Sequence, residues 1–205
     1  MTTPRHPLLP ALALLLLGCD SQRTTSESAA PVSTATTPPG ASAVSYQKQL
    51  QRGDYSFAVQ TLGTGSQRQL VWRAERLGRE LASMTDNLDG SVLDAQVTNL
   101  NNDEYPELLV FVADAGSGSY GRLVGYEFLS RGRRPLTLPT LEGAAADGYL
   151  GHDSFRIDGR RIIRTFPIYR PTDPNSTPSG GTRTVEYEMP KKEGAITVVG
   201  HRDGV

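Results

Sequence analysis

The residues from Asp114 to Leu123 gather hydroxyl groups and glycines in one short segment. Ser117, Ser119 and Tyr120 supply hydroxyls that can donate hydrogen bonds to a carboxylate. The intervening glycines carry no side-chain bulk, which lets a loop protrude. This chemistry suits a loop that fills a polar cleft better than it suits a catalytic centre.

The same segment matches the G-x-G-x-x-G spacing of dinucleotide-binding loops between Gly116 and Gly121. Such a loop requires a strand before it and a helix after it, whose N-terminus meets the pyrophosphate. The following residues, Leu123 to Leu129, have the pattern of another strand. The spacing therefore does not predict a nucleotide site.

A second candidate is a run of oxygen-bearing side chains at alternate positions, formed by Asn99, Asn101, Asp103 and Glu107. It resembles a calcium loop, and also the FG-GAP repeats of β-propeller proteins. Glu104 stands where an EF-hand has glycine, and no helices flank the loop. An Asn/Asp turn before a strand is the plainer interpretation. A calcium-dependent or glycan-binding envelope module using this loop is the alternative function.

Catalytic groups are sparse. Ser117, His152 and Asp153 could be named as a triad, but there is no nucleophile elbow. The acidic residues single out no pair for glycoside hydrolysis. The residues Gly148 to Asp153 instead indicate a tight corner, in which His152 and Asp153 can hydrogen-bond buried backbone groups. We expect no enzyme and no cofactor.

The elements that must position these residues are strands. Apolar and polar residues alternate in short segments, separated by turn signals, and this pattern predicts an antiparallel β-sandwich. Asp89-Gly90 and Asp158-Gly159 are hairpin signals. The expected strands are Tyr55–Leu62, Ser91–Thr98, Leu108–Ala113, Arg122–Leu129, Ser154–Ile157, Arg160–Thr165, Thr182–Met189 and Ala195–Val199.

Three segments leave alternatives open. Residues 70–86 fit a helical stripe or two strands, and Gly78 favours strands on either side of it. Residues 46–51 could form a short leading helix. The arginines of a third segment indicate a solvated strand face or a surface for an acidic partner: Arg156, Arg160, Arg161, Arg164 and Arg170.

The start of the chain has the pattern of an export signal. Residues 1–18 contain an apolar run too short to span a bilayer, and the segment ending at Cys19 resembles the lipobox of bacterial lipoproteins. We expect a lipid on Cys19, a flexible linker over residues 19–44 and a domain over residues 45–205. The expected location is the periplasmic face of the envelope, and Asp20 favours the inner membrane.

Composition limits the partners and the chemistry. The chain has 21 Lys and Arg against 22 Asp and Glu, so no strong field of one sign favours nucleic acid. Its single cysteine, if lipidated, leaves the exported domain without a disulfide.

Five motifs occur in an order that resembles the periplasmic inhibitors of invertebrate-type (i-type) lysozyme. They are Asp94–Leu108, Ser117–Gly121, Gly148–Asp153, Arg164–Tyr169 and Pro178–Arg183. The resemblance implies an all-β sandwich, a homodimer and a loop that enters the enzyme's substrate cleft. The chain departs from the family where Asp103-Glu104 replaces a more usual Asp-Gly.

By position, the resemblance makes Ser117, Gly118, Ser119, Tyr120 and Gly121 the inhibitor loop. Ser117 and Tyr120 would contact the active site of lysozyme, where a hydroxyl can bond to a catalytic carboxylate and an aromatic ring can anchor the interface. Supporting contacts are expected from Arg122, His152, Arg164 and Tyr169.

Overall fold

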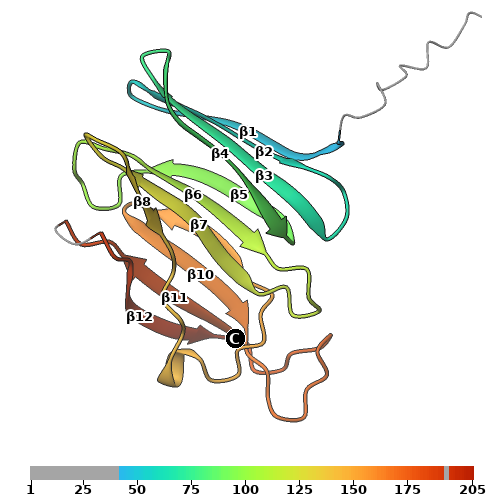
Figure 1. The fold of residues 1–205 in the computed structure, drawn as a ribbon. Coiled ribbons are helices and arrows are strands. Elements are labelled where there is room, and N and C mark those ends of the chain that lie inside the picture. The colour runs from blue at the N-terminus through green and yellow to red at the C-terminus, as the bar shows by residue number, and fades with distance from the viewer. Residues whose placement is uncertain (1–41, 192–193) are drawn as a thin grey trace, which may run out of the picture. The chain divides into compact units, whose positions relative to one another are not determined.

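The computed structural model describes residues 42–191 and 194–205, and this part of the chain is an all-β domain. The predicted leader, Cys19, Asp20 and most of the predicted linker lie outside the described residues. Within the described part, the strands form three antiparallel sheets of four (Figure 1). No helix in this part is long and apolar enough to cross a membrane.

In each sheet, neighbouring strands are consecutive in the chain. The first sheet contains β1 (Val44–Arg52), β2 (Tyr55–Leu62), β3 (Gln67–Arg76) and β4 (Arg79–Asp89). The second contains β5 (Ser91–Thr98), β6 (Glu107–Ala113), β7 (Gly121–Phe128) and β8 (Arg133–Leu136). The third has the order β12 (Thr197–Gly204), β11 (Thr182–Glu188), β10 (Arg161–Pro167) and β9 (Ser154–Asp158). A 3₁₀ turn spans Gly143–Ala145.

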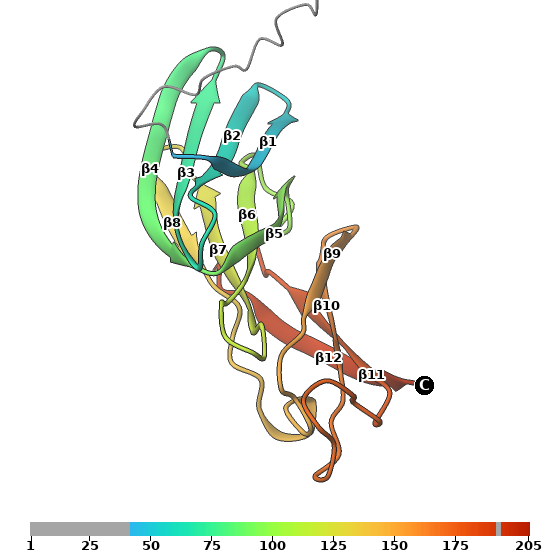
Figure 2. The same cartoon turned by 90° about the vertical axis from the view of Figure 1, so that its right-hand side faces the viewer.

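The second sheet is covered on both faces. Every residue of β6 is buried, which explains its continuous apolar run. One face packs through Val110 against Phe57 and Trp72 of the first sheet. The other face packs through Phe111, whose ring stacks on that of Phe155 in the third sheet with centroids 4.7 Å apart. The predicted antiparallel sandwich is therefore confirmed, with β5–β8 as the middle of three layers (Figure 2).

Residues 70–86 form two strands, as Gly78 indicated. Leu77 and Gly78 make the turn between β3 and β4 with φ values of 51° and 75°, and such a pair of positive angles matches the twist of a hairpin. The short helix predicted over residues 46–51 is wrong. These residues belong to β1, where Tyr46 and Leu50 pack on the core and Gln49 faces solvent.

One of the two hairpin signals is also wrong. Asp158-Gly159 joins β9 and β10 as a hairpin. Asp89-Gly90 instead carries the chain from the first sheet into the second, because β4 and β5 do not pair. Gly90 has φ 114° and lies against the carbonyl of Ala113, so a side chain there would collide with backbone.

Candidate functional site

The hydroxyl-rich segment forms the loop that joins β6 to β7. Its base is closed by the Asp114 amide, which donates to the Tyr120 carbonyl at 3.0 Å. A turn at its tip is closed by the Ser119 amide, which donates to the Gly116 carbonyl at 2.9 Å. Ser117 is exposed and Tyr120 is 42% exposed, whereas Gly118 between them is buried. The loop therefore presents a hydroxyl and an aromatic ring on a backbone that faces inward.

The predicted corner Gly148–Asp153 packs directly beneath this loop. The His152 amide donates to the Gly118 carbonyl at 2.7 Å. Gly151 has φ 92°, and a Cβ there would collide with that same carbonyl. A Cβ on Gly118 would come within 2.8 Å of the Leu150 carbonyl. The close backbone approach requires glycine on both sides.

A buried ion pair fixes the start of β7. The Asp153 and Arg164 side chains are 0% and 6% exposed, and the Arg164 Nε donates to the Asp153 carboxylate at 2.6 Å. The same carboxylate accepts from the Gly121 amide and from the Tyr149 hydroxyl, each at 2.6 Å. Arg164 also donates to the Tyr149 hydroxyl and to the Gly121 carbonyl. Both backbone groups of Gly121 are thus bonded to this pair.

The electrostatics favour the charged form of Arg164. Burial opposes the charge of Arg164, but the hydrogen bond and charge of Asp153 outweigh it and hold the pKa of Arg164 above its usual value. Burial, and then the hydrogen bond to Asp153, raises the pKa of Tyr149. The guanidinium also lies 4.7 Å from the centroid of the Tyr149 ring.

Aromatic packing extends from this pair to the exposed tyrosine. The Tyr149 ring meets Phe166 edge-on, with centroids 4.6 Å apart. It also meets Tyr120 edge-on at 5.4 Å. The exposed Tyr120 therefore rests on a ring that the ion pair holds in place.

The four expected supporting residues surround the loop in different ways. Arg122 pairs with Asp114 across the loop base at 2.7 Å. The His152 backbone is left-handed at φ 60°, its side chain is exposed, and its ring lies 6.2 Å from that of Tyr169, which is itself buried. Arg164 lies beneath the loop and donates to the Gly121 carbonyl. The structure thus brings together all the residues predicted for this site.

Sequence reasoning gave the wrong environment for one of these residues and missed two others. Arg164 was expected on a solvated strand face, but it points into the core from β10. Tyr149 and Asn175 were not singled out. Asn175 donates from Nδ2 to the Ser117 carbonyl at 3.2 Å. The glycines around Tyr149 were the available signal, whereas nothing local marks Asn175.

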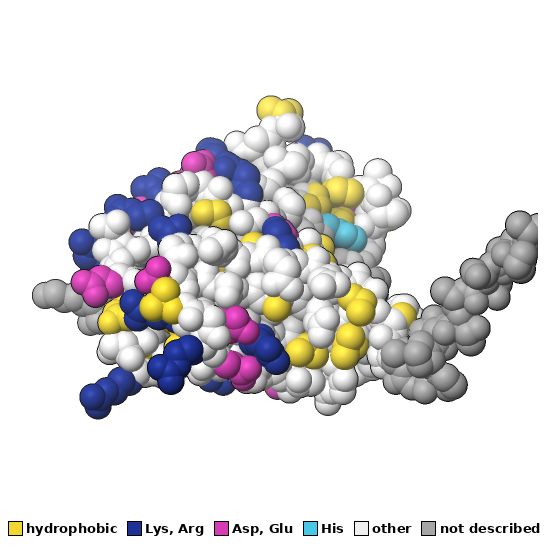
Figure 3. Space-filling view, turned by 90° about the horizontal axis from the view of Figure 1, so that it is seen from above, with side chains coloured by type: hydrophobic (Ala, Val, Ile, Leu, Met, Phe, Trp, Pro, Cys, Tyr) yellow, Lys and Arg dark blue, Asp and Glu magenta, His cyan; other side chains and the backbone are white. Residues whose placement is uncertain are grey.

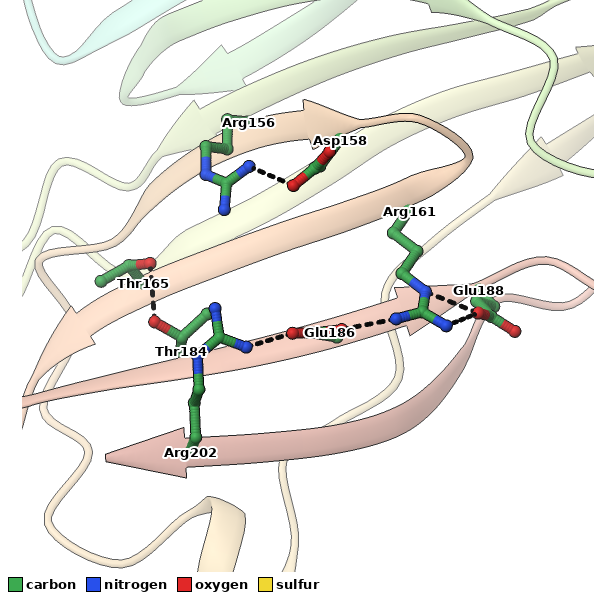
Figure 4. Close-up of polar contacts among 8 residues, drawn as sticks. All are labelled: Arg156, Asp158, Arg161, Thr165, Thr184, Glu186, Glu188 and Arg202. Atoms are coloured by element: carbon green, nitrogen blue, oxygen red, sulfur yellow. Dashed lines mark hydrogen bonds and ion pairs between the residues drawn. The ribbon is translucent and has the colours of Figure 1, made fainter. Parts of the chain in front are cut away.

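Arg156 and Arg161 do lie on an exposed face of the third sheet, together with Arg202 (Figure 4). Arg160 and Arg170 are exposed outside the strands, in the β9–β10 turn and in the loop after β10. Arg161 pairs with Glu186 at 2.9 Å and also with Glu188, and Arg202 approaches Glu186 from the other side. These ion pairs join β10, β11 and β12.

A second view, from above the first sheet, shows Lys and Arg gathered toward one side with acidic side chains among them (Figure 3).

The triad suggested by the residue types is not assembled in the described part of the chain. The Asp153 carboxylate is directed to Arg164, Tyr149 and the Gly121 amide. No hydrogen bond between the side chains of Ser117, His152 and Asp153 occurs there. The Asp153 carboxylate instead bonds to groups that hold the loop backbone.

The Asn99–Glu107 segment is held by its own side chains. The Asp103 amide donates to the side-chain oxygens of Asn99 at 3.0 Å and Asn101 at 3.1 Å, and the Asp103 carboxylate accepts from the Tyr105 amide at 2.6 Å. These bonds are those of an Asx-rich turn. No group of three His, Cys, Asp or Glu residues able to hold a metal is found in the described ranges.

Glu107 is the unusual member of this segment. Its side chain is buried, and Oε2 accepts from the Leu100 amide at 2.8 Å and the Thr98 hydroxyl at 2.9 Å. Oε1 has no partner. Burial raises the pKa of Glu107, with a smaller contribution from neighbouring Asp103 and Glu127, and this outweighs its two hydrogen bonds.

The fold and the site together describe an all-β domain that displays a hydroxyl-bearing loop, held by hydrogen bonds, over a buried ion pair. Comparisons with protein-family models, curated proteins and solved structures find no match.

Proposed function

We propose that this protein is an inhibitor of lysozyme, with the i-type enzymes as its main target, attached to the periplasmic face of the bacterial envelope through a lipid on Cys19. In this proposal the Ser117–Gly121 loop enters the substrate cleft and protects peptidoglycan. The observation that supports it most directly is the contrast within the loop. Ser117 and Tyr120 are exposed, whereas the backbone between and after them is fixed by Gly151, Asp153 and Arg164.

The chemistry of a lysozyme cleft matches these two side chains. Such a cleft contains a pair of catalytic carboxyl groups. The Ser117 hydroxyl can donate to an ionised carboxylate, and a hydrogen bond to a charged acceptor contributes about 1.5–3 kcal/mol. The Tyr120 ring can fill the saccharide-binding groove and adds a polar tip. Because the loop is ordered in advance, little entropy is lost on binding.

The direct test measures clearing of a cell-wall suspension by i-type, c-type and g-type lysozymes in the presence of the mature chain carrying Cys19→Ser. Tyr120→Ala should weaken inhibition by about 2 kcal/mol, or roughly 30-fold, as expected for a central aromatic anchor. Leu129→Ala is the matched control, because Leu129 is 38% exposed and follows the opposite end of β7.

The outcomes separate two claims. If no lysozyme class is inhibited, the function is wrong. If lysozyme is inhibited but Tyr120→Ala behaves like Leu129→Ala, the loop assignment is wrong and another surface binds the enzyme. Light scattering on the same sample tests the homodimer that the resemblance implies.

A further inference from the structure

The long loop between β10 and β11 is closed by its own hydrogen bonds although most of it is exposed. We call residues 170–179 the brace loop. The Asp173 carboxylate accepts from the Arg170 amide at 2.7 Å and from both the amide and the hydroxyl of Ser179 at 2.8 Å. The bond from the Arg170 amide, followed by those from Ser179, lowers the pKa of Asp173. The carboxylate thus closes the brace loop around itself.

The two ends of the brace loop are also tied together. The Gly180 amide donates to the Ile168 carbonyl, and the Ile168 amide donates to the Gly181 carbonyl, each at 2.9 Å. A Cβ on Gly180 would come within 2.6 Å of the Ile168 carbonyl oxygen, so this approach requires glycine. A connection of this length with so many internal bonds is built to hold a shape.

One residue of the brace loop reaches the inhibitor loop. Asn175 donates from Nδ2 to the Ser117 carbonyl at 3.2 Å, across 58 residues of chain. Its own carbonyl accepts from the hydroxyl of Tyr169 at 2.9 Å, and Tyr169 is buried. Asn175 is therefore connected to the core on one side and to Ser117 on the other. The two loops lie at the same end of the domain (Figure 1).

We infer that Asn175 is a positioning residue for the Ser117–Gly121 loop, and that the brace loop exists to hold it there. The effect of this positioning on lysozyme binding rests on the proposed function, but the positioning of the loop does not. The Gly118 and Gly121 backbone is held from below by His152, Asp153 and Arg164. Asn175 adds a bond to the carbonyl of Ser117, at the exposed tip whose hydroxyl must be directed at a partner.

The experiment compares Asn175→Ala and Asn175→Asp with wild type and with Ser176→Ala. Asn175→Asp keeps the size of the side chain but replaces its donor with an acceptor. Ser176 is the matched control, because it is exposed and its side chain bonds only to Thr177 among the described residues. Circular dichroism confirms that every variant is folded.

The first measurement needs no partner. Hydrogen exchange of the Ser119 and His152 amides, which donate within and beneath the inhibitor loop, reports how often the loop opens. Loss of one neutral hydrogen bond should accelerate this exchange about 3–10-fold in both Asn175 variants. Ser176→Ala should leave it unchanged.

The second measurement is the inhibition constant against an i-type lysozyme, which should rise by about the same factor in both Asn175 variants. Unchanged exchange in Asn175→Ala and Asn175→Asp overturns the inference whether or not the protein inhibits lysozyme. Faster exchange with an unchanged inhibition constant overturns the claim that this positioning affects the binding of lysozyme. Faster exchange in a protein that inhibits no lysozyme refutes the proposed function and leaves the positioning role standing.

Discussion

The buried pair of Asp153 and Arg164 makes a quantitative prediction about stability. Asp153→Asn removes the charge but keeps the shape of the side chain. The carboxylate accepts from Arg164 Nε, the Gly121 amide and the Tyr149 hydroxyl, all at 2.6 Å. An amide has only one acceptor oxygen, so its NH₂ group must face at least one of these donors. The guanidinium, 6% exposed, then lacks its counter-ion.

Breaking a buried ion pair by removing one partner costs about 3–5 kcal/mol, and we expect a loss in that range for Asp153→Asn. The matched control is Asp158→Asn at the far end of β9, the strand that begins directly after Asp153. Asp158 pairs with Arg156 at 2.9 Å, but these side chains are 66% and 55% exposed. An exposed pair of this kind contributes about 0–1 kcal/mol. The two variants therefore each remove one carboxylate charge, from a buried position just before β9 and from an exposed position at its end.

The assay is urea unfolding at pH 7, followed by circular dichroism and by the fluorescence of Trp72, which lies in the other core. Coincident transitions from the two probes would show that the layers unfold together. The double variant Asp153→Leu/Arg164→Met, which removes both charges of this pair, should recover much of the loss. A loss below about 1 kcal/mol, or one equal to that of Asp158→Asn, would refute the assigned role of the pair.

Three further predictions concern single sites. Gly151→Ala should destabilise the domain by more than Gly159→Ala, and it should also weaken inhibition. Both glycines have positive φ, but only a side chain at Gly151 would collide with the Gly118 carbonyl. Equal urea midpoints for the two variants would contradict this. Burial raises the pKa of Glu107 above 4.5, so its protonated form contributes stability at low pH that is lost as pH rises through the raised value. Unfolding free energy measured from pH 4.5 to 8 should decline less steeply in Glu107→Gln, and identical slopes would exclude Glu107 as the cause. Calcium or a chelator should leave the melting temperature unchanged, whereas a calcium-dependent rise abolished by Asp103→Ala would support the alternative envelope module.

The three-layer arrangement explains why some local patterns were informative and others were not. Alternation in β2 and the apolar run in β6 follow directly from burial on one face or on both. The Asp89-Gly90 signal failed because a turn dipeptide specifies local backbone angles and not whether the next strand pairs or changes sheet. Residues 46–51 are too few for helical and strand periodicity to be distinguished by pattern alone.

In the candidate site, too, the sequence pattern does not reveal the environment of every side chain. Arg164 and Arg161 lie on one strand and look alike in the sequence, yet one is buried against Asp153 and the other is exposed beside Glu186 and Glu188. Because the side-chain period of a strand is two, an offset of one residue in phase exchanges the two faces. A segment with arginines at both phases does not reveal which of them is buried.

The sequence by itself determined an all-β domain and a protruding loop rich in hydroxyls and glycines, because alternation, turn residues and missing side-chain bulk act over a few neighbouring positions. Only the tertiary structure decided what holds that loop. Gly121 meets Asp153 across 32 residues, and Asn175 meets Ser117 across 58. Contacts at that separation depend on how the sheets stack and which face each strand buries, and no local pattern specifies either.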